Sequence, residues 1–150
     1  MILPERKKNR LENYDYSQNG AYFITICTRD HKKILSQIVG ADTIRPYEII
    51  LSQYGKIVDK AINNIANIYE NISVDKYVIM PDHVHMILRI TNNGGRMVSA
   101  PTVIAGMKRY VSKKCGVSIW QKSYYDHIIR NQKDYNEIWE YIEHNPEKEK

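Results

Sequence analysis

Cysteine, phenylalanine and long apolar runs are scarce in this sequence. Its 150 residues include two cysteines and one phenylalanine. Cys27 and Cys115 form no CxxC motif, which indicates reduced thiols and a cytoplasmic protein rather than a disulfide framework. No segment approaches the roughly 20 apolar residues that cross a bilayer, and the stretch MILPERKKNR lacks the apolar core of a secretory signal. These absences exclude a membrane-spanning class and favour a single globular domain over residues 1–150.

Positive charge and tyrosine are what the sequence has in excess. The formal net charge is +5, which favours an anionic partner, and nucleic acid is the commonest one. The 12 tyrosines can stack on bases or hydrogen-bond to phosphate, but tyrosine also covers half-exposed faces of sheets. Composition alone leaves both interpretations of the tyrosines open.

The hydrophobic pattern predicts alternating strands and helices. Residues 1–20 are basic and rich in turn formers, which predicts an irregular arm. Strands are predicted over residues 21–28, 46–52, 73–80 and 83–90, and again just before residue 131. Helices are predicted to begin after Ser52, Ser99 and Asn131 and to end near Ile68, Gly116 and Pro146. This order predicts an antiparallel-rich α+β fold, close to ferredoxin-like, with the helices packed on one face of the sheet.

The stretch MPDHVHMILRI carries two histidines in an otherwise apolar strand. Because side chains alternate across a strand, His83 and His85 share one face, while Asp82 and Val84 point to the other. Two imidazoles held side by side suit a divalent metal ion, although a pair of merely tolerated histidines gives the same pattern. A nucleotide hydrolase with the pattern H-φ-H-φ-H would need a third histidine where Ile87 stands. That alternative therefore lacks its nucleophile.

The predicted last helix contributes a tyrosine and a carboxamide one turn apart. Tyr141 and Asn145 are spaced i, i+4 and share a face that Ile138 and Ile142 would bury against the sheet. A tyrosine hydroxyl acts as a nucleophile when a cation favours the phenolate, and a carboxamide oxygen can bind a metal ion. Spacing alone equally allows a surface tyrosine and an ordinary asparagine before Pro146.

Three segments carry a resemblance to a known family: NYDYSQNGAYFITICT, YVIMPDHVHMIL and WQKSYYDHIIRNQKDYNEIWEYIEHNPEK. With them the chain resembles the REP-associated tyrosine transposases, a branch of the single-tyrosine HUH transposases of insertion sequences. The resemblance covers residues 13–148, and the combination of PDHVH, YDHIIR and YIxxNP is far more specific than any one piece. Asp82 departs mildly from the family, in which many members have asparagine. Since we expect Asp82 to face away from the histidines, we expect the ligand set to be unaffected.

The resemblance implies an enzyme that nicks and joins single-stranded DNA beside a hairpin. His83, His85 and Asn145 would hold one Mg²⁺ or Mn²⁺ ion, and Tyr141 would attack the scissile phosphate. The products would be a 5′-phosphotyrosine and a free 3′-hydroxyl, and the covalent bond would allow strand transfer. One nucleophile per site means that cutting and rejoining are either sequential or shared between the subunits of a homodimer. The family fold is a ferredoxin-like α+β domain whose C-terminal helix carries the tyrosine.

Basic residues are candidates for contacts with DNA phosphates. They are Arg6, Lys7, Lys8 and Arg10 in the arm, Lys108, Arg109, Lys113 and Lys114 on the helix before Gly116, and Arg130 before the last helix. The cations on the helix are equally explained as a solvated face. His127 and His144 are weaker candidates for an acid or base, because His127 lies in an apolar strand and His144 is one residue off the face of Tyr141.

Two classes of function stay open. The first is an active transposase that associates with the nucleoid through DNA, and the second is a domesticated, sequence-specific binder of DNA hairpins that no longer cuts. The complete set of His83, His85 and Tyr141 favours the enzyme. A more distant class, an RNA-binding ferredoxin-like module, would not need the histidine pair, and the RNP-like pattern of aromatic and basic residues is absent.

Overall fold

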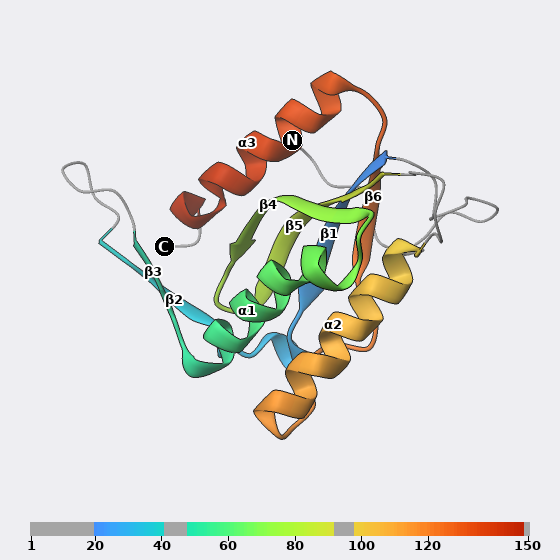
Figure 1. Cartoon of the computed structure of the whole chain (residues 1–150). Coiled ribbons are helices and arrows are strands. Elements are labelled where there is room, and N and C mark those ends of the chain that lie inside the picture. Colours follow the sequence, from blue (N-terminus) through green and yellow to red (C-terminus); the bar gives the residue numbers. More distant parts are fainter. Residues whose placement is uncertain (1–19, 41–47, 92–97, 149–150) are drawn as a thin grey trace.

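The structure is a computed structural model of the chain, and it describes residues 20–40, 48–91 and 98–148 (Figure 1). The predicted basic arm, with Arg6, Lys7, Lys8 and Arg10, lies outside the described residues.

A four-stranded antiparallel sheet forms the centre of the fold. Its strands are β1 (Gly20–Cys27), β4 (Ile72–Ile79), β5 (His83–Ile90) and β6 (Tyr125–Ile129), and their order in the sheet is β4-β5-β1-β6. The helices are α1 (Gln53–Ile68), α2 (Ala100–Cys115) and α3 (Gln132–Lys148). Without the small hairpin of β2 (Ser36–Val39) and β3 (Glu48–Leu51), the order along the chain is β1-α1-β4-β5-α2-β6. This is the ferredoxin-like split βαβ arrangement, so the predicted α+β fold class is confirmed.

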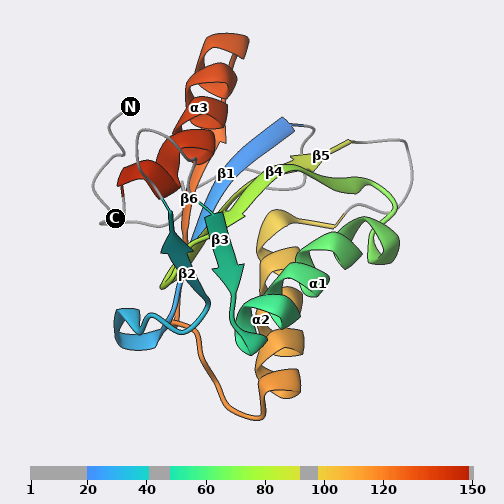
Figure 2. The same cartoon turned by 90° about the vertical axis from the view of Figure 1, so that its left-hand side faces the viewer.

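The helices cover both faces of the sheet, which corrects the prediction that they pack on one face. Tyr22 and Ile24 of β1 alternate with Ala21 and Phe23, and the two sets belong to separate apolar clusters. The larger cluster joins one face to α1 and α2, and the smaller joins the other face to Ile138 and its neighbours on α3. Figures 1 and 2 show α3 across the sheet from the other two helices. Both faces of the central strands are apolar enough to bury a helix, so the sheet is a middle layer.

Side-chain caps begin each long helix where the sequence predicts them. The Ser52 hydroxyl accepts a hydrogen bond from Gly55 N at 3.0 Å, and Asn131 Oδ1 accepts one from Asp134 N at 2.8 Å. Gly116 ends α2 in the left-handed conformation, with a φ of 80°. The predicted end of the last helix at Pro146 is wrong, because α3 continues to Lys148. A proline in the last turn removes only one hydrogen bond of the helix, so its effect there is small.

Within the part of the chain that the structure describes, no helix is long and apolar enough to cross a bilayer.

Two helical glycines allow a matched test of packing. A Cβ on Gly55 of α1 would overlap the backbone carbonyl of Leu35, whereas a Cβ on Gly106 of α2 would meet only the Tyr69 hydroxyl, at 3.0 Å. Overpacking against backbone costs about 1–3 kcal/mol, and alanine in place of glycine inside an open helix gains up to about 1 kcal/mol. We expect Gly55→Ala to lower the free energy of unfolding and Gly106→Ala to leave it unchanged or raise it. Urea denaturation measures both, and equal effects would contradict this packing.

Candidate active site

The two histidines stand on the face of β5 that is covered by α3. His83 lies opposite Cys27 and His85 opposite Thr25 in the antiparallel pairing with β1. Their ring centroids are 4.6 Å apart, and Val84 between them is fully buried in the cluster with α1 and α2. The structure therefore confirms that both histidines share one face and that Val84 occupies the other.

Tyr141 of α3 lies directly over this pair. The centroid of its ring is 5.4 Å from that of His85 and 6.0 Å from that of Phe23. Phe23, the single phenylalanine of the chain, also stacks on His85 with centroids 5.3 Å apart. Tyr141 is partly exposed, whereas Ile142 beside it is buried against the sheet. Phe23 thus forms an apolar floor beneath both the imidazole and the phenol.

A polar cluster at the sheet edge fixes α3 over the histidines. Asp75 of β4 accepts hydrogen bonds from Tyr135 Oη of α3 and from Arg89 Nε of β5, both at 2.8 Å. Lys76 of β4 forms an ion pair with Glu143 of α3. These contacts and the buried isoleucines hold the helix in one position over the sheet. The orientation of Tyr141 therefore depends on residues outside the site itself.

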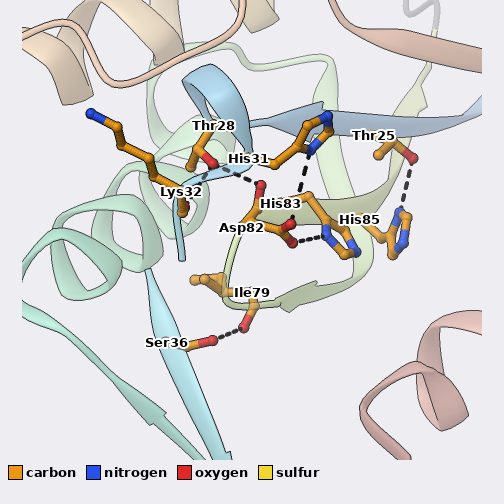
Figure 3. Close-up of polar contacts among 9 residues, drawn as sticks. All are labelled: Thr25, Thr28, His31, Lys32, Ser36, Ile79, Asp82, His83 and His85. Carbon is orange, nitrogen blue, oxygen red and sulfur yellow. Dashed lines mark hydrogen bonds and ion pairs between the residues drawn. The ribbon is translucent and has the colours of Figure 1, made fainter. Parts of the chain in front are cut away.

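Each histidine has its Nδ1 engaged by an oxygen (Figure 3). His83 Nδ1 is 2.7 Å from Asp82 Oδ1, and His85 Nδ1 is 2.8 Å from Thr25 Oγ1. The expectation that Asp82 faces away from the histidines is wrong, because β5 begins at His83 and the alternation of a strand does not extend into the turn. Sequence analysis missed Thr25 altogether, because only the pairing of β1 with β5 brings it to His85.

Burial keeps the His85 imidazole neutral. His85 is 3% exposed, and desolvation, followed by the charge of neighbouring His83, lowers the pKa of His85 from 6.5 to about 3. A neutral imidazole has a free lone pair on one nitrogen, which is the form that binds a metal ion. With Nδ1 engaged by Thr25, the remaining nitrogen is Nε2.

Asn145 is buried on the same helix as Tyr141, one turn later. It is 5% exposed, and among the described residues its Oδ1 has no hydrogen-bond partner. A buried carbonyl oxygen without a partner is costly unless a donor or a cation satisfies it. Two imidazoles and one such oxygen fit a divalent metal ion such as Mg²⁺ or Mn²⁺. Within the described residues no three His, Cys, Asp or Glu side chains form a metal site, so an oxygen of another kind would complete the set.

Two of the four predicted cations of α2, Lys108 and Arg109, border a separate cleft, whereas Lys113 and Lys114 do not line it. Its volume is about 630 Å³, and its basic lining residues are Arg29, His31, Lys108, Arg109 and Lys122. Lys108 Nζ donates to the Gln121 carbonyl at 2.8 Å, so this ammonium group is already engaged by the loop before β6. Arg109 is exposed in the same cleft.

The remaining polar candidates lie on the outside of α3 or beside it. Arg130 is exposed at the end of β6. His127 Nε2 is 2.9 Å from Asp134 Oδ2, and His144 Nε2 is 3.0 Å from Glu140 Oε2. Each of these histidines is thus paired with a carboxylate of α3.

Comparisons with known proteins were made in sequence and in structure. No family model matches the chain. It is 29% identical over 167 residues to an uncharacterized protein of Haemophilus influenzae, covering 96% of this chain and 89% of that protein. It is 25% identical over 134 residues to the REP-associated tyrosine transposase of Escherichia coli, covering 89% of this chain and 70% of the relative.

The solved structure of a REP-associated tyrosine transposase bound to a REP hairpin has the same fold. The TM-score is 0.67 at 25% identity, over 93% of this chain and 74% of that one. The sequence comparison and the structural comparison thus both identify a REP-associated tyrosine transposase, and each covers most of the chain. This chain is therefore a homologue of the REP-associated tyrosine transposases, which confirms the resemblance carried by its motifs.

Proposed function

We propose that the chain is a metal-dependent transposase that cuts single-stranded DNA beside a hairpin through a covalent bond to Tyr141. The observation that carries the proposal is the position of the Tyr141 ring, 5.4 Å from His85 and on the same side of the sheet as His83. A tyrosine hydroxyl beside two imidazoles that could hold a metal ion is an arrangement suited to metal-assisted phosphoryl transfer. The homologue that was solved with a REP hairpin supports DNA of this kind as the substrate.

The reaction exchanges one phosphodiester bond for another. Tyr141 Oη attacks the scissile phosphorus in line, the bond from phosphorus to the 3′-oxygen breaks, and the phenolic proton is lost to solvent while the departing 3′-oxygen gains one. The downstream strand is then joined to the enzyme as a 5′-phosphotyrosine, and the upstream strand ends in a free 3′-hydroxyl. Because the new ester keeps the energy of the old one, a 3′-hydroxyl can attack it and reseal or transfer the strand.

The residues around Tyr141 divide the remaining tasks. His83, His85 and Asn145 would hold a divalent ion, which supplies Lewis-acid polarisation of the phosphate when bound. Phe23 and Ile142 shield from water the side of the Tyr141 phenol that faces the sheet. Within the cleft of about 630 Å³, exposed Arg109 is better placed than engaged Lys108 to contact phosphates of the strand.

The alternative function, a hairpin binder that no longer cuts, predicts the same DNA complex without a covalent product. The two are separated by a denaturing gel after incubation with Mn²⁺ or Mg²⁺ and single-stranded hairpins that carry randomised flanks. We expect wild type to form an adduct that retains a 3′-end label and not a 5′-end label, because the downstream fragment is the one joined to tyrosine.

Tyr141→Phe should abolish this adduct, since phenylalanine has no nucleophilic oxygen, and EDTA should abolish it in the wild type. Tyr110→Phe, at an exposed tyrosine of α2 on the other side of the sheet, is the matched control and should retain it. An adduct at wild-type level with Tyr141→Phe would show that another residue is the nucleophile. Retained hairpin binding with no adduct from wild type would establish the binder instead.

The buried neutral imidazole predicts a dependence of stability on pH. In the unfolded chain His85 takes up a proton below about pH 6.5, whereas in the folded chain its pKa of about 3 keeps it neutral. The unfolded state thus binds more protons between these values, and His85 should lower the free energy of unfolding by roughly 1 kcal/mol per pH unit as the pH falls from 6.5. Urea denaturation in EDTA at pH 6 and pH 5 measures the slope. His85→Gln should show a smaller slope, and identical slopes for the two proteins would contradict a neutral His85.

A further inference from the structure

Asp82 is in direct contact with one of the two histidines and is not used by the chemistry described above. Its Oδ1 lies 2.7 Å from His83 Nδ1, and the two side chains are only 20% and 15% exposed. A carboxylate has acceptors but no donor, so the proton in this bond belongs to the imidazole. His83 is therefore held as the tautomer with hydrogen on Nδ1, and its lone pair is on Nε2.

The backbone of Asp82 is fixed from the other side of the turn. Thr28, which is fully buried at the end of β1, donates from its backbone N to the Asp82 carbonyl at 2.9 Å, and its hydroxyl oxygen lies 3.1 Å from the same carbonyl. The backbone N of Leu35 donates to the carbonyl of Pro81 at 3.0 Å. Figure 3 shows the contact between Thr28 and Asp82 beside the histidines. The turn is thus tied to two other segments, which gives the carboxylate a defined position.

The second oxygen of Asp82 faces another histidine. His31 Nδ1 is 3.9 Å from Asp82 Oδ2, and the His31 side chain is 61% exposed, so water weakens this contact. Asp30 and His31 have φ values of 57° and 53°, a region that side-chain-bearing residues rarely adopt. The chain turns sharply here and brings His31 back over the turn. Asp82 therefore faces His83 through a short shielded bond and His31 through a long exposed contact.

We propose that Asp82 is a positioning residue for His83: it fixes the tautomer and the ring orientation that present Nε2 to a metal ion. The proposal deepens the proposed metal-dependent function and rests on it for the identity of the ligand. Where a carboxylate accepts a hydrogen bond from the second N–H of a metal-binding histidine, its removal commonly weakens metal binding by about 10- to 100-fold. Thr25 stands in the equivalent place for His85, through a hydroxyl that is 2.8 Å from Nδ1.

The tautomer of His83 can be measured without a metal ion. Long-range ¹⁵N–¹H NMR of the full chain in EDTA distinguishes a protonated Nδ1 from a protonated Nε2. We expect His83 of the wild type to carry its proton on Nδ1 and Asp82→Ala to show a mixture of the two tautomers. Asp82→Asn should keep the wild-type tautomer, because the carboxamide oxygen can still accept the bond. The signals of His85 should stay unchanged in both variants.

Binding of Mn²⁺, followed by electron paramagnetic resonance, gives the second readout. We expect Asp82→Ala to weaken binding about 10- to 100-fold and Asp82→Asn to weaken it less. Glu70→Ala removes one exposed carboxylate just before β4, at the end of the sheet where Ile72 pairs with Ile90 and therefore at the opposite end of β5 from His83, and should bind like wild type. This control separates positioning from a general loss of negative charge.

The outcomes distinguish this proposal from the proposed function. An unchanged His83 tautomer in Asp82→Ala, in a protein whose amide spectrum shows the native fold, would overturn the positioning role. Undiminished Mn²⁺ affinity of Asp82→Ala would overturn it as well. If the wild type binds no Mn²⁺ while the tautomer still changes in Asp82→Ala, the metal-dependent function fails and the positioning of His83 by Asp82 stands.

Discussion

The candidate site depends on the register of one strand, β5, which is buried on both faces. Its even-numbered residues, among them Val84 and Met86, fill the core with α1 and α2, while His85 faces α3 at 3% exposure. A slip of one residue would place both histidines in the apolar core with α1 and α2 and move Val84 and Met86 to the face under α3. The hydrophobic effect that folds the sheet therefore also sets the direction of the imidazoles. Tyr141 adds only one further requirement, the docking of α3.

Local signals were sufficient for the long helices and for the strands of the main sheet, but not for β2, and they were sufficient for half of the site. Alternation in HVHMILRI fixes the face of His83 and His85, and the caps Ser52 and Asn131 begin their helices because each hydrogen bond spans only a few residues. Asn145 follows from Tyr141 by helical spacing. The family resemblance then predicts that the histidine pair, Tyr141 and Asn145 belong to one site.

Non-local pairing explains what the sequence did not predict. Thr25 reaches His85 only because β1 pairs with β5 across 60 positions, and nothing in the sequence of either strand states that register. The face chosen by α3 has the same origin, since Ile138 and Ile142 could pack on either side of an apolar sheet. The predicted direction of the Asp82 side chain is wrong for a local reason: Asp82 precedes the first residue of β5, so the alternation of a strand does not extend to it.

The candidate site also contains buried polar groups whose burial opposes folding. The carbonyl oxygen of Asn145 is buried with no hydrogen-bond partner among the described residues, and His85 is buried without charge. Unsatisfied buried groups oppose folding, and the apolar cluster that joins Phe23 of β1 to Ile142 of the same helix offsets them. A cation that bound these groups only in the folded state would lower that cost and stabilise the docking of α3. The burial of these groups is unfavourable in the free protein. The binding of a cation would therefore be coupled to the docking of α3 and, through it, to the placement of Tyr141.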